Sequence, residues 1–479
     1  MPASTGFADA IGTFIDAWDD GLVEAYKNVV PLLADAPLRE GQLVGGKYHV
    51  ATRLTYEGGT SFAPPQTQPG DTAATPYVGP RSGYSPDAQV EGMQIHGRSR
   101  LTYEAIARSS QSVSDTGENK KKAVKSATRI VMDGLLQGTL KKVETLMLHG
   151  RRGIGQLDSA VNGSNVVATT YEGVSGFAVD LNISAASWSE AIWAAFEGHT
   201  FDLFGNTGGV PSGARLNATA NTSLTGGALQ NGFILIAVNP PTALLNGTVN
   251  GRVVRLWHSA GTAGAWGTGV IGGWTTPASG AQVEHLAFES GGPTNEFIGL
   301  SAMAQNSGTL FNINSASFGM YRGNSVSSVG NLRLSQLIRY LKTPINHGAQ
   351  GTTIRAVVPT ELFSQFANDE STLRRYAMST GNAENGFDSI EMYLPHKSKL
   401  EILGHALQKD GEVMAYVPSE CMRVGSQDLD FVNRNGRSRK DAIVVEVQDR
   451  PASEVRLFGQ FAPIVETPRH MLFLSGITF

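Results

Sequence analysis

Cysteine is almost missing from this chain, since Cys421 is the only one in 479 residues. A single cysteine excludes an internal disulfide framework and is typical of proteins that fold in a reducing compartment. Cys421 lies between two expected strands and has no marked partner for nucleophilic chemistry. We therefore expect it to act as a small buried apolar residue.

Charged residues are also few, at 17% of the chain, and the net charge of −4 at pH 7 gives no general reason to expect nucleic-acid binding. Long apolar runs are missing, so no segment approaches membrane-spanning length. The N-terminus carries Asp9, Asp16, Asp19 and Asp20 in place of the basic start of a targeting peptide. We expect no membrane partner and a chain that is made and folded in the cytoplasm.

The motifs of common catalytic and metal sites are missing or misplaced. Gly41, Gly46 and Lys47 have the spacing of a phosphate-binding loop, but Tyr48 stands where Ser or Thr binds magnesium, and a strand follows where a helix should begin. The glycines of 267–272 fit GxGxxG, yet no helix is expected after them. Neither HExxH nor CxxC nor GxSxG occurs. We predict no enzyme activity, no catalytic residues, no metal site and no cofactor.

The longest continuous structural signal that the chain does have runs from Asp115 to Gly150. Asp115 and Glu118 form a capping box, and Gly150 is a C-terminal stop. The pattern predicts a helix of roughly 45 Å that crosses a whole subunit, with an ordinary core helix as the alternative. Apolar residues recur at steps of three and four, which keeps one helical face dry; they are Val124, Ala127, Val131, Leu135, Leu136, Leu140, Val143 and Met147.

Two kinds of segment precede this helix. Residues 7–29 have an apolar face and an acidic face, which predicts a helix that Pro31 ends or kinks. This helix covers either the core of its own subunit or a neighbour. Alternating patterns then predict strands over 47–56 and from Met93 through Tyr103. Between the strands, Glu57–Val90 is rich in Gly, Pro, Ser and Thr, so we expect either a disordered loop or a flap ordered by other copies of the chain.

Strand-and-turn patterns dominate from Ser187 to about Gly330. Ser187 and Glu190 predict a capped helix that stops at Gly198. A more regular α/β section follows, in which Asn331 caps a helix that ends before Pro344. The strands expected in the first part are 233–238, 252–257, 282–288 and 296–302.

The last part of the chain continues this α/β section and then turns to strands. Residues 353–358 form an expected strand, and Thr360 caps an expected helix with a second helical piece near Leu373. Asn435–Gly436 is a hairpin signal. The other strands expected here are 390–394, 400–403, 413–417, 429–432, 442–447, 455–461 and 471–474. The expected fold class is α+β, and 479 residues predict two or three lobes.

A basic run lies in the first turns of the long predicted helix, where positive charge opposes the helix dipole. Its members are Lys120, Lys121, Lys122, Lys125 and Arg129. They form either a solvated face or a contact with a polyanion or an acidic neighbour, and the acidic arm of another copy is one candidate.

The order of these parts resembles that of tailed-bacteriophage major capsid proteins, which have the HK97-type fold. Lys47–Tyr56 and Gly92–Arg108 resemble the two sides of the extended loop of that family, and Glu118–His149 resembles its spine helix. Thr353–Pro359 resembles the core of its axial domain, and Leu400–Gly404 resembles the start of its passage back to the peripheral domain.

The resemblance implies a division of the chain into six parts. These are an N-terminal arm (1–40), an extended loop (41–108), the spine helix and start of the peripheral domain (109–200), a β-rich part of an enlarged axial domain or an insertion (201–330), the axial core (331–418) and the return to the peripheral sheet (419–479). Assembly contacts are then expected at apolar and basic residues of the arm and of the loop tip, namely Phe14, Trp18, Tyr56, Phe62, Pro64, Pro65, Tyr77, Arg81 and Tyr84.

The function that the resemblance implies is mechanical. Copies of the chain would form hexamers and pentamers of an icosahedral virion shell around double-stranded DNA, assembled in the bacterial host cytoplasm. A separate scaffolding protein, a portal and a decoration protein are the further expected partners, with no N-terminal segment removed. Because Glu57–Val90 contains no lysine, no crosslink from the loop is expected. The alternatives are an encapsulin-like compartment shell and, from another class, a β-rich carbohydrate-active enzyme with paired carboxylates.

Overall fold

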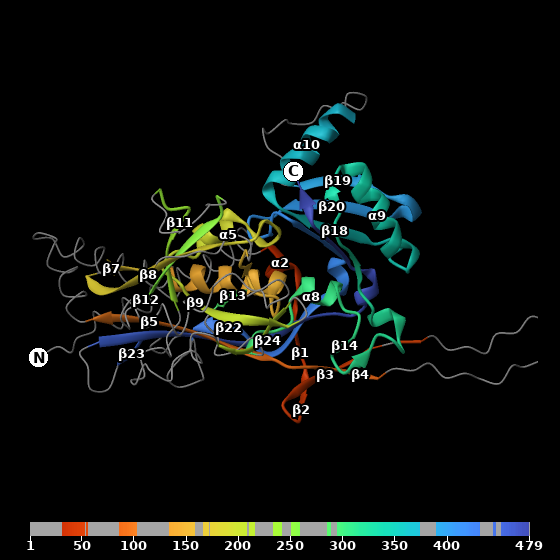
Figure 1. Cartoon of the computed structure of the whole chain (residues 1–479). Helices are drawn as coiled ribbons and strands as arrows, with labels where there is room; N and C mark the ends of the chain where they lie inside the picture. The colour runs from red at the N-terminus through yellow and green to blue at the C-terminus, as the bar shows by residue number, and fades with distance from the viewer. Residues whose placement is uncertain are drawn as a thin grey trace, which may run out of the picture.

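A computed structural model of the chain shows helices and strands of an α+β fold (Figure 1). It describes residues 31–52, 54–55, 86–102, 134–158, 166–171, 173–207, 210–215, 233–241, 251–258, 285–288, 295–373, 389–431, 444–446 and 452–478. Among these residues, no helix is both long enough and apolar enough to cross a membrane.

A helix over 134–149, called here the central helix, is surrounded by the rest of the body. Leu136, Leu140, Val143 and Met147 are buried on it, as the spacing predicts. The helix ends at Gly150, where a Cβ would lie 2.3 Å from the carbonyl oxygen of Phe297. Only glycine fits this close approach. The part predicted over 115–133 lies outside the described residues.

A five-stranded sheet lies against one side of the central helix. Its strands come from distant parts of the chain, and the order is β1-β22-β24-β23, with β5 paired to β24 on the free edge. The first strand, β1, runs parallel to β22, whereas the other pairs are antiparallel. The strands are β1 (Leu38–Glu40), β5 (Met93–Thr102), β22 (Cys421–Phe431), β23 (Val444–Glu446) and β24 (Ala452–Val465).

An eight-stranded sheet is the second large sheet of the body, and its residue Phe288 lies against Lys142 of the central helix. Its order is β6-β13-β9-β11-β12-β8-β7, with β10 paired to β9. It starts well before residue 201, so the β-rich lobe begins earlier than the sequence patterns suggested. The strands are β6 (Gly155–Gln156), β7 (Val166–Tyr171), β8 (Val174–Asn182), β9 (Thr200–Thr207), β10 (Val210–Arg215), β11 (Phe233–Val238), β12 (Val253–His258) and β13 (His285–Phe288).

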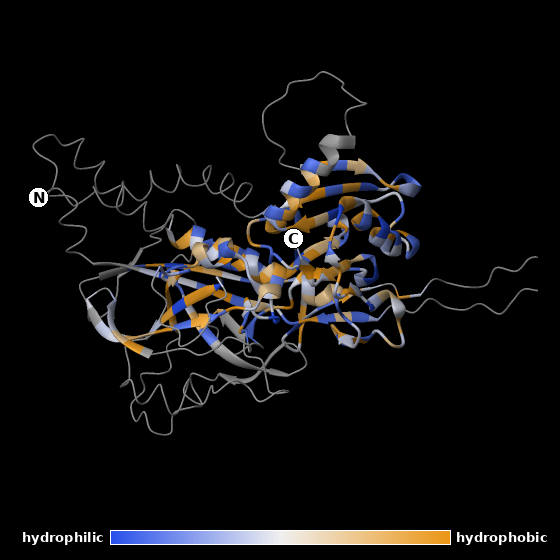
Figure 2. Ribbon diagram, turned by 45° about the horizontal axis from the view of Figure 1, so that its top comes forward, coloured by the Kyte–Doolittle hydropathy of each residue, from blue (hydrophilic) through white to orange (hydrophobic). Residues whose placement is uncertain are grey.

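A six-stranded mixed sheet with two helices forms a third unit with its own apolar core. The order is β16-β25-β21-β18-β20-β19, and Figure 2 shows the apolar residues concentrated along its inner strands. Its elements are β16 (Asn324–Val326), α9 (Leu334–Asn346), β18 (Thr353–Val358), α10 (Thr360–Leu373), β19 (Ser389–Tyr393), β20 (Lys399–Gly404), β21 (Glu412–Tyr416) and β25 (Leu472–Ser475).

Smaller elements join these units. A three-stranded sheet β2-β3-β4 lies at the periphery of the molecule (Figure 1). These elements are α2 (Pro31–Asp35), β2 (Gln42–Val44), β3 (Lys47–Ala51), β4 (Asp87–Val90), η1 (Ala185–Ser187), α5 (Glu190–Ala195), α8 (Leu300–Ala304), β14 (Thr309–Leu310), β15 (Ile313–Asn314), η5 (Gly319–Tyr321), β17 (Gly330–Asn331), η7 (Pro395–Lys397), η8 (Pro418–Glu420), η9 (Pro468–His470) and β26 (Ile477–Thr478).

Several predicted helix boundaries are wrong. The helix after Ser187 is capped by Ser189 instead, because the Ser187 hydroxyl accepts the backbone N–H of Gln156. The helix expected to follow Asn331 has Arg333 at its N-cap position, and the backbone N–H of Arg333 donates to Gln336 Oε1 at 3.0 Å. It also continues through Pro344 and places that ring in the core.

Two further expectations change. Residues 296–302 were expected to form a strand, but α8 occupies the end of that range because Leu300, Met303 and Ala304 bury one helical face. Residues 87–90 belong to β4 and not to the loop. The helix expected over 7–29 lies outside the described residues, and α2 is described from Pro31 on.

Candidate assembly site at the base of the projecting hairpin

The assembly contacts predicted from the sequence all lie outside the described residues. These are Phe14 and Trp18 of the arm, the loop residues Tyr56, Phe62, Pro64, Pro65, Tyr77, Arg81 and Tyr84, and the basic run Lys120, Lys121, Lys122, Lys125 and Arg129. What the structure does describe is the base from which the loop leaves the body.

This base is the hairpin of β3 and β4, whose antiparallel register pairs Tyr48 with Val90 and Ala51 with Asp87. At the last described rung, both the backbone N–H and the hydroxyl of Thr52 donate to the Pro86 carbonyl, at 3.3 and 2.8 Å. Thr52 is buried. The two strands are therefore paired up to Thr52 and Pro86.

A strained turn also holds β4, in addition to its pairing with β3. The backbone N–H of Gln89 donates to the carbonyl oxygen of Phe311, at 3.0 Å, in the turn between β14 and β15. Phe311 and Asn312 have φ of 51° and 66°, and Phe311 is buried. A bulky residue in the left-handed region is costly and persists only where surrounding packing imposes it. The packing of Phe311 thus fixes the turn that holds β4.

A chain of charges links the hairpin to the end of the central helix. Glu91, just after β4, lies 3.3 Å from Lys47 of β3 and 3.3 Å from the guanidinium of Arg151. The hydrogen bond from Lys47 is the main cause that lowers the pKa of Glu91. Because Arg151 directly follows Gly150, the pairing ties the hairpin to the last turn of the helix.

Arg151 also binds a buried carboxylate. Its backbone N–H donates to Glu296 Oε2 at 3.1 Å, and its Nε donates to the Glu296 carbonyl at 2.8 Å. Burial raises the pKa of Glu296 to about 7. The other carboxylate oxygen, Oε1, is buried and makes no hydrogen bond.

A second buried carboxylate joins the arm to the central helix and the α/β unit. The two oxygens of Glu144 accept the backbone N–H groups of Leu32 and Leu33 at 2.8 and 3.0 Å, which caps the start of α2. His405 Nδ1 accepts the N–H of Leu407, so Nε2 carries the proton and donates to Glu144 at 3.1 Å. Glu144 is fully buried.

The loop between β20 and β21 packs against the end of the same helix. His149 Nε2 donates to the Leu407 carbonyl at 3.2 Å, and Lys409 Nζ donates to the Gly153 carbonyl at 2.9 Å. Arg152 lies 3.2 Å from Glu412. Burial, followed by nearby Lys409 and Arg152, lowers the pKa of His149 well below its usual value. Burial also lowers the pKa of Lys409 to about 8.

Sequence reasoning missed Glu144, Arg151 and Glu296. One signal for Glu144 was present, because it lies on the apolar stripe between Leu140 and Leu148 at helical spacing, where a charge needs a buried partner. Nothing in the sequence indicates the partners themselves. Glu144 and His405 are separated by 261 positions.

Among the described residues, these networks hold backbone groups and pair charges. Cys421 is buried, which raises its pKa to about 12, as the sequence predicts for a small core residue. Asp428 is held by Arg423 at 2.6 Å. In the part of the chain that the structure describes, no cluster of three His, Cys, Asp or Glu side chains could hold a metal ion.

Comparison with known proteins gives results at the level of structure only. No protein-family model matches the chain, and no curated protein matches it. Solved structures of shell-forming proteins do match, with TM-scores below 0.5.

Three of these structures show the range. The cyanophage A-1(L) capsid has 8% sequence identity and a TM-score of 0.45, and the match covers 94% of this chain and 93% of the other. The mature capsid of bacteriophage PhiM1 has 7% identity and a TM-score of 0.37, with coverage of 93% and 86%. The virus-like particle from Pyrococcus furiosus has 12% identity and a TM-score of 0.19, with coverage of 30% and 48%.

Proposed function

We propose that this chain is the major capsid protein of a tailed bacteriophage, with an HK97-type fold, and that many copies build an icosahedral shell. The observation that carries the proposal is the hairpin of β3 and β4. Its base is closed by Thr52, held laterally by Phe311 and tied by Glu91 to the central helix. Such a base fixes the positions of the two ends of the segment that joins β3 to β4.

The segment that this base holds has no core-forming composition of its own. Residues 56–85 are mainly Gly, Pro, Ser and Thr with scattered aromatics, so another surface has to bury them. In an assembly of identical copies, that surface is the neighbouring subunit. The aromatic and basic residues Tyr56, Phe62, Tyr77, Arg81 and Tyr84 are the proposed contacts, together with Pro64 and Pro65.

Strand β2 provides a second contact surface beside the hairpin. Leu43 and Val44 expose 55% and 50% of their surface there. Exposed aliphatic residues on a short edge strand are suited to a partner chain, because association removes their apolar surface from water. We assign this edge to subunit contacts as well.

The role of the chain is mechanical and not enzymatic. The buried networks of Glu144 and Glu412 connect the arm, the central helix and the α/β unit, so a force on the hairpin is carried into the whole body. Further partners belong to the proposal: packaged double-stranded DNA, a separate scaffolding protein, a portal and a decoration protein. The virion is the proposed location, after assembly in the host bacterial cytoplasm.

Electron microscopy of the purified chain tests the proposal. We expect closed shells or hexameric rings, with nuclease-protected double-stranded DNA inside shells isolated from virions. A stable monomer of 50.8 kDa at high protein concentration would overturn it. Shells that enclose a protein cargo and no DNA would instead support an encapsulin-like compartment.

A further inference from the structure

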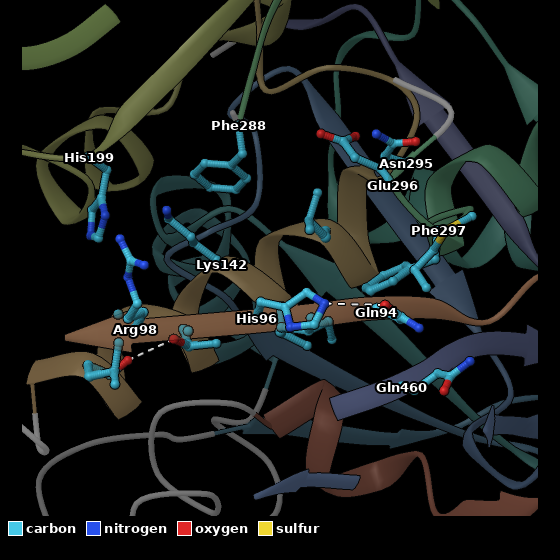
Figure 3. A pocket seen from close by; sticks show the side chains of 18 of the residues that line it. Gln94, His96, Arg98, Lys142, His199, Phe288, Asn295, Glu296, Phe297 and Gln460 are labelled. Carbon is cyan, nitrogen blue, oxygen red and sulfur yellow. Dashed lines mark hydrogen bonds between the residues drawn. The ribbon is translucent and has the colours of Figure 1, made fainter. Parts of the chain in front are cut away.

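A cleft of about 880 Å³ runs along one side of the central helix. Its walls are β5, the helix residues from Gly134 to Leu146, and side chains of the eight-stranded sheet and of 295–297. Figure 3 shows Arg98, Lys142 and His199 together at one end, with Asn295 and Glu296 across from them. The cleft therefore has a basic end and an acidic end.

The basic end carries positive charge near an aromatic ring. Lys142 Nζ lies 5.4 Å from the centre of the Phe288 ring, and Arg98 is 60% exposed with a long contact of 3.9 Å to Glu454. Burial, followed by Lys142 and Lys141, lowers the pKa of His199 to about 4. His199 is consequently neutral at pH 7, and the charge at this end comes from the lysines and Arg98.

The acidic end carries Glu296, whose Oε1 is buried and makes no hydrogen bond. An unpartnered carboxylate oxygen favours a ligand with hydrogen-bond donors and repels a continuous polyanion such as nucleic acid. A polypeptide fits both ends of the cleft. Its backbone N–H groups can donate to Glu296, and its acidic side chains can pair with Lys142 and Arg98.

The cleft also has room for a second chain against the helix. A Cβ at Gly134 would meet no atom within 4 Å, and one at Gly138 would touch only the His199 ring. Glycine at these two positions, one turn apart, leaves the helix backbone open to close approach. Apolar groups including Ile95, Val143 and Leu146 line the same space, so an aromatic side chain can be buried there.

The N-terminal 30 residues of the chain carry acidic and aromatic side chains that suit this cleft. Asp9, Asp16, Asp19, Asp20 and Glu24 are opposed by Lys27 alone, and Phe14 and Trp18 are spaced one helical turn apart. This segment lies outside the described residues and ends where α2 begins. Its amino acids supply acidic side chains for the basic end of the cleft, aromatic rings for its apolar wall and amide donors for Glu296.

The geometry of α2 favours the arm of another copy over the arm of the same chain. Leu32 and Leu33 are fixed to Glu144 of the central helix. Glu144 lies two residues after Lys142, which is roughly 200° around the helix at 3.6 residues per turn. The arm thus joins the body on the face of the helix opposite the cleft.

We propose that the cleft is the docking site for the acidic segment Phe14–Asp20 of a neighbouring copy, with Asp19 or Asp20 at Lys142 and Arg98 and an aromatic ring beside Val143. This inference rests on the proposed shell function, because it requires copies in contact. It places the arm in a specific cleft and makes each subunit hold its neighbour at a second point besides the hairpin.

Disulfide trapping tests the docking with full-length chains. Cys421 is buried, so engineered cysteines are the reactive ones. Chains with Ala17→Cys are mixed with chains carrying Thr139→Cys in the cleft, assembled and oxidised. We expect a covalent pair of chains on a non-reducing gel, and none when Thr139→Cys is replaced by Lys342→Cys, an exposed position on α9.

The outcomes separate this inference from the proposed function. Shells that form without the covalent pair would overturn the docking alone. A disulfide formed only within a chain carrying both Ala17→Cys and Thr139→Cys would also overturn it. Failure of the unmodified chain to assemble, seen by microscopy before oxidation, would defeat the proposed function and this inference with it.

Charge reversal supplies an independent measurement. Lys142→Glu should reduce assembly at a fixed protein concentration by about tenfold, and Asp19→Lys with Asp20→Lys in the same chain should restore most of it. No restoration would contradict the pairing. If Lys142→Glu instead abolishes binding of a single-stranded oligonucleotide while assembly is unchanged, the cleft is a nucleic-acid surface and the proposal is wrong.

Discussion

At the scale of single residues, Glu144 is the side chain on which several backbone and side-chain hydrogen bonds depend. One fully buried carboxylate accepts three donors, from Leu32, Leu33 and His405. A carboxylate is suited to this because both of its oxygens only accept. A glutamine at this position would have only one accepting oxygen. Its NH₂ group would face a donor and could not accept from it.

Glu144→Gln should therefore leave at least one buried donor without a partner, at a cost of about 2 kcal/mol. The Leu32 and Leu33 amides would then exchange their hydrogens about thirtyfold faster. Hydrogen-exchange mass spectrometry over 31–35 measures this. Gln137→Ala, at an exposed position of the same helix, is the control and should leave the rate unchanged; equal effects of both variants would contradict the capping role.

Glu296 makes stability depend on pH in a direction opposite to that of an ordinary surface carboxylate. Burial raises its pKa from 4.5 to about 7. The folded chain thus keeps a proton that the unfolded chain has released between these values. This carboxyl stabilises the fold fully below pH 4.5, and its contribution is lost as the pH rises through about 7.

Glu296→Gln should consequently be nearly neutral at pH 5 and stabilising at pH 8, by up to about 3 kcal/mol. Urea unfolding of the unassembled chain at the two pH values measures the difference. Glu91→Gln is the matched control, and its effect on stability should be opposite. Because the pKa of Glu91 is lowered, removing this carboxylate should destabilise the fold at pH 8. The same change in stability at both pH values for Glu296→Gln would refute the account.

At the scale of elements, continuous β-branched and apolar runs were located well from the sequence. The strand expected at 233–238 is β11, and the strand expected at 353–358 is β18. Both are packed in sheet interiors, so their patterns are long and unbroken. The buried face of the central helix was also predicted correctly over its described turns, because its apolar residues recur at clear helical spacing.

Short elements that depend on tertiary contacts could not be found in this way. Strand β4 has four residues and no pattern of its own, and it exists because β3 and Phe311 supply its hydrogen bonds. Helix α8 has five residues, too few to show a period. The cap of α5 moved from Ser187 to Ser189 because the Ser187 hydroxyl binds Gln156, a partner 31 positions away.

Two glycines of the central helix allow the effect of close packing and the effect of helix propensity to be measured separately. Gly150→Ala would place its Cβ 2.3 Å from the Phe297 carbonyl oxygen and 2.6 Å from that of Leu146. Backbone would have to move, so we expect a loss of several kcal/mol or no soluble protein. Gly134→Ala meets no atom within 4 Å and should stabilise by about 1 kcal/mol. Thermal unfolding of the two variants measures the contrast, and similar midpoints would contradict it.

At the scale of the whole molecule, the body is closed by pairings between distant segments. β5 pairs with β24, and β1 lies parallel to β22. Arg423 reinforces the second pairing, because its Nε donates to the Ala36 carbonyl at 2.7 Å. No periodicity within a segment encodes such pairings, which is why the sheet membership could not be predicted from the sequence.

One consequence concerns the end of the chain. The final residues were assigned as a whole to the return into the peripheral sheet, yet β25 pairs with β21 in the six-stranded sheet, and β26 pairs with β17. The chain therefore crosses between both large units after β24. This crossing and the Glu144 network join the units at two places.

The central claim is that the projecting hairpin completes its structure on another copy. Replacing residues 57–85 by a two-residue turn keeps β3, β4, Thr52 and Pro86, and so keeps the clamped base. Sedimentation velocity of this shortened chain beside the full chain is the most direct test. We predict a folded monomer that fails to form shells, whereas closed shells from the shortened chain, in normal yield, would contradict the account.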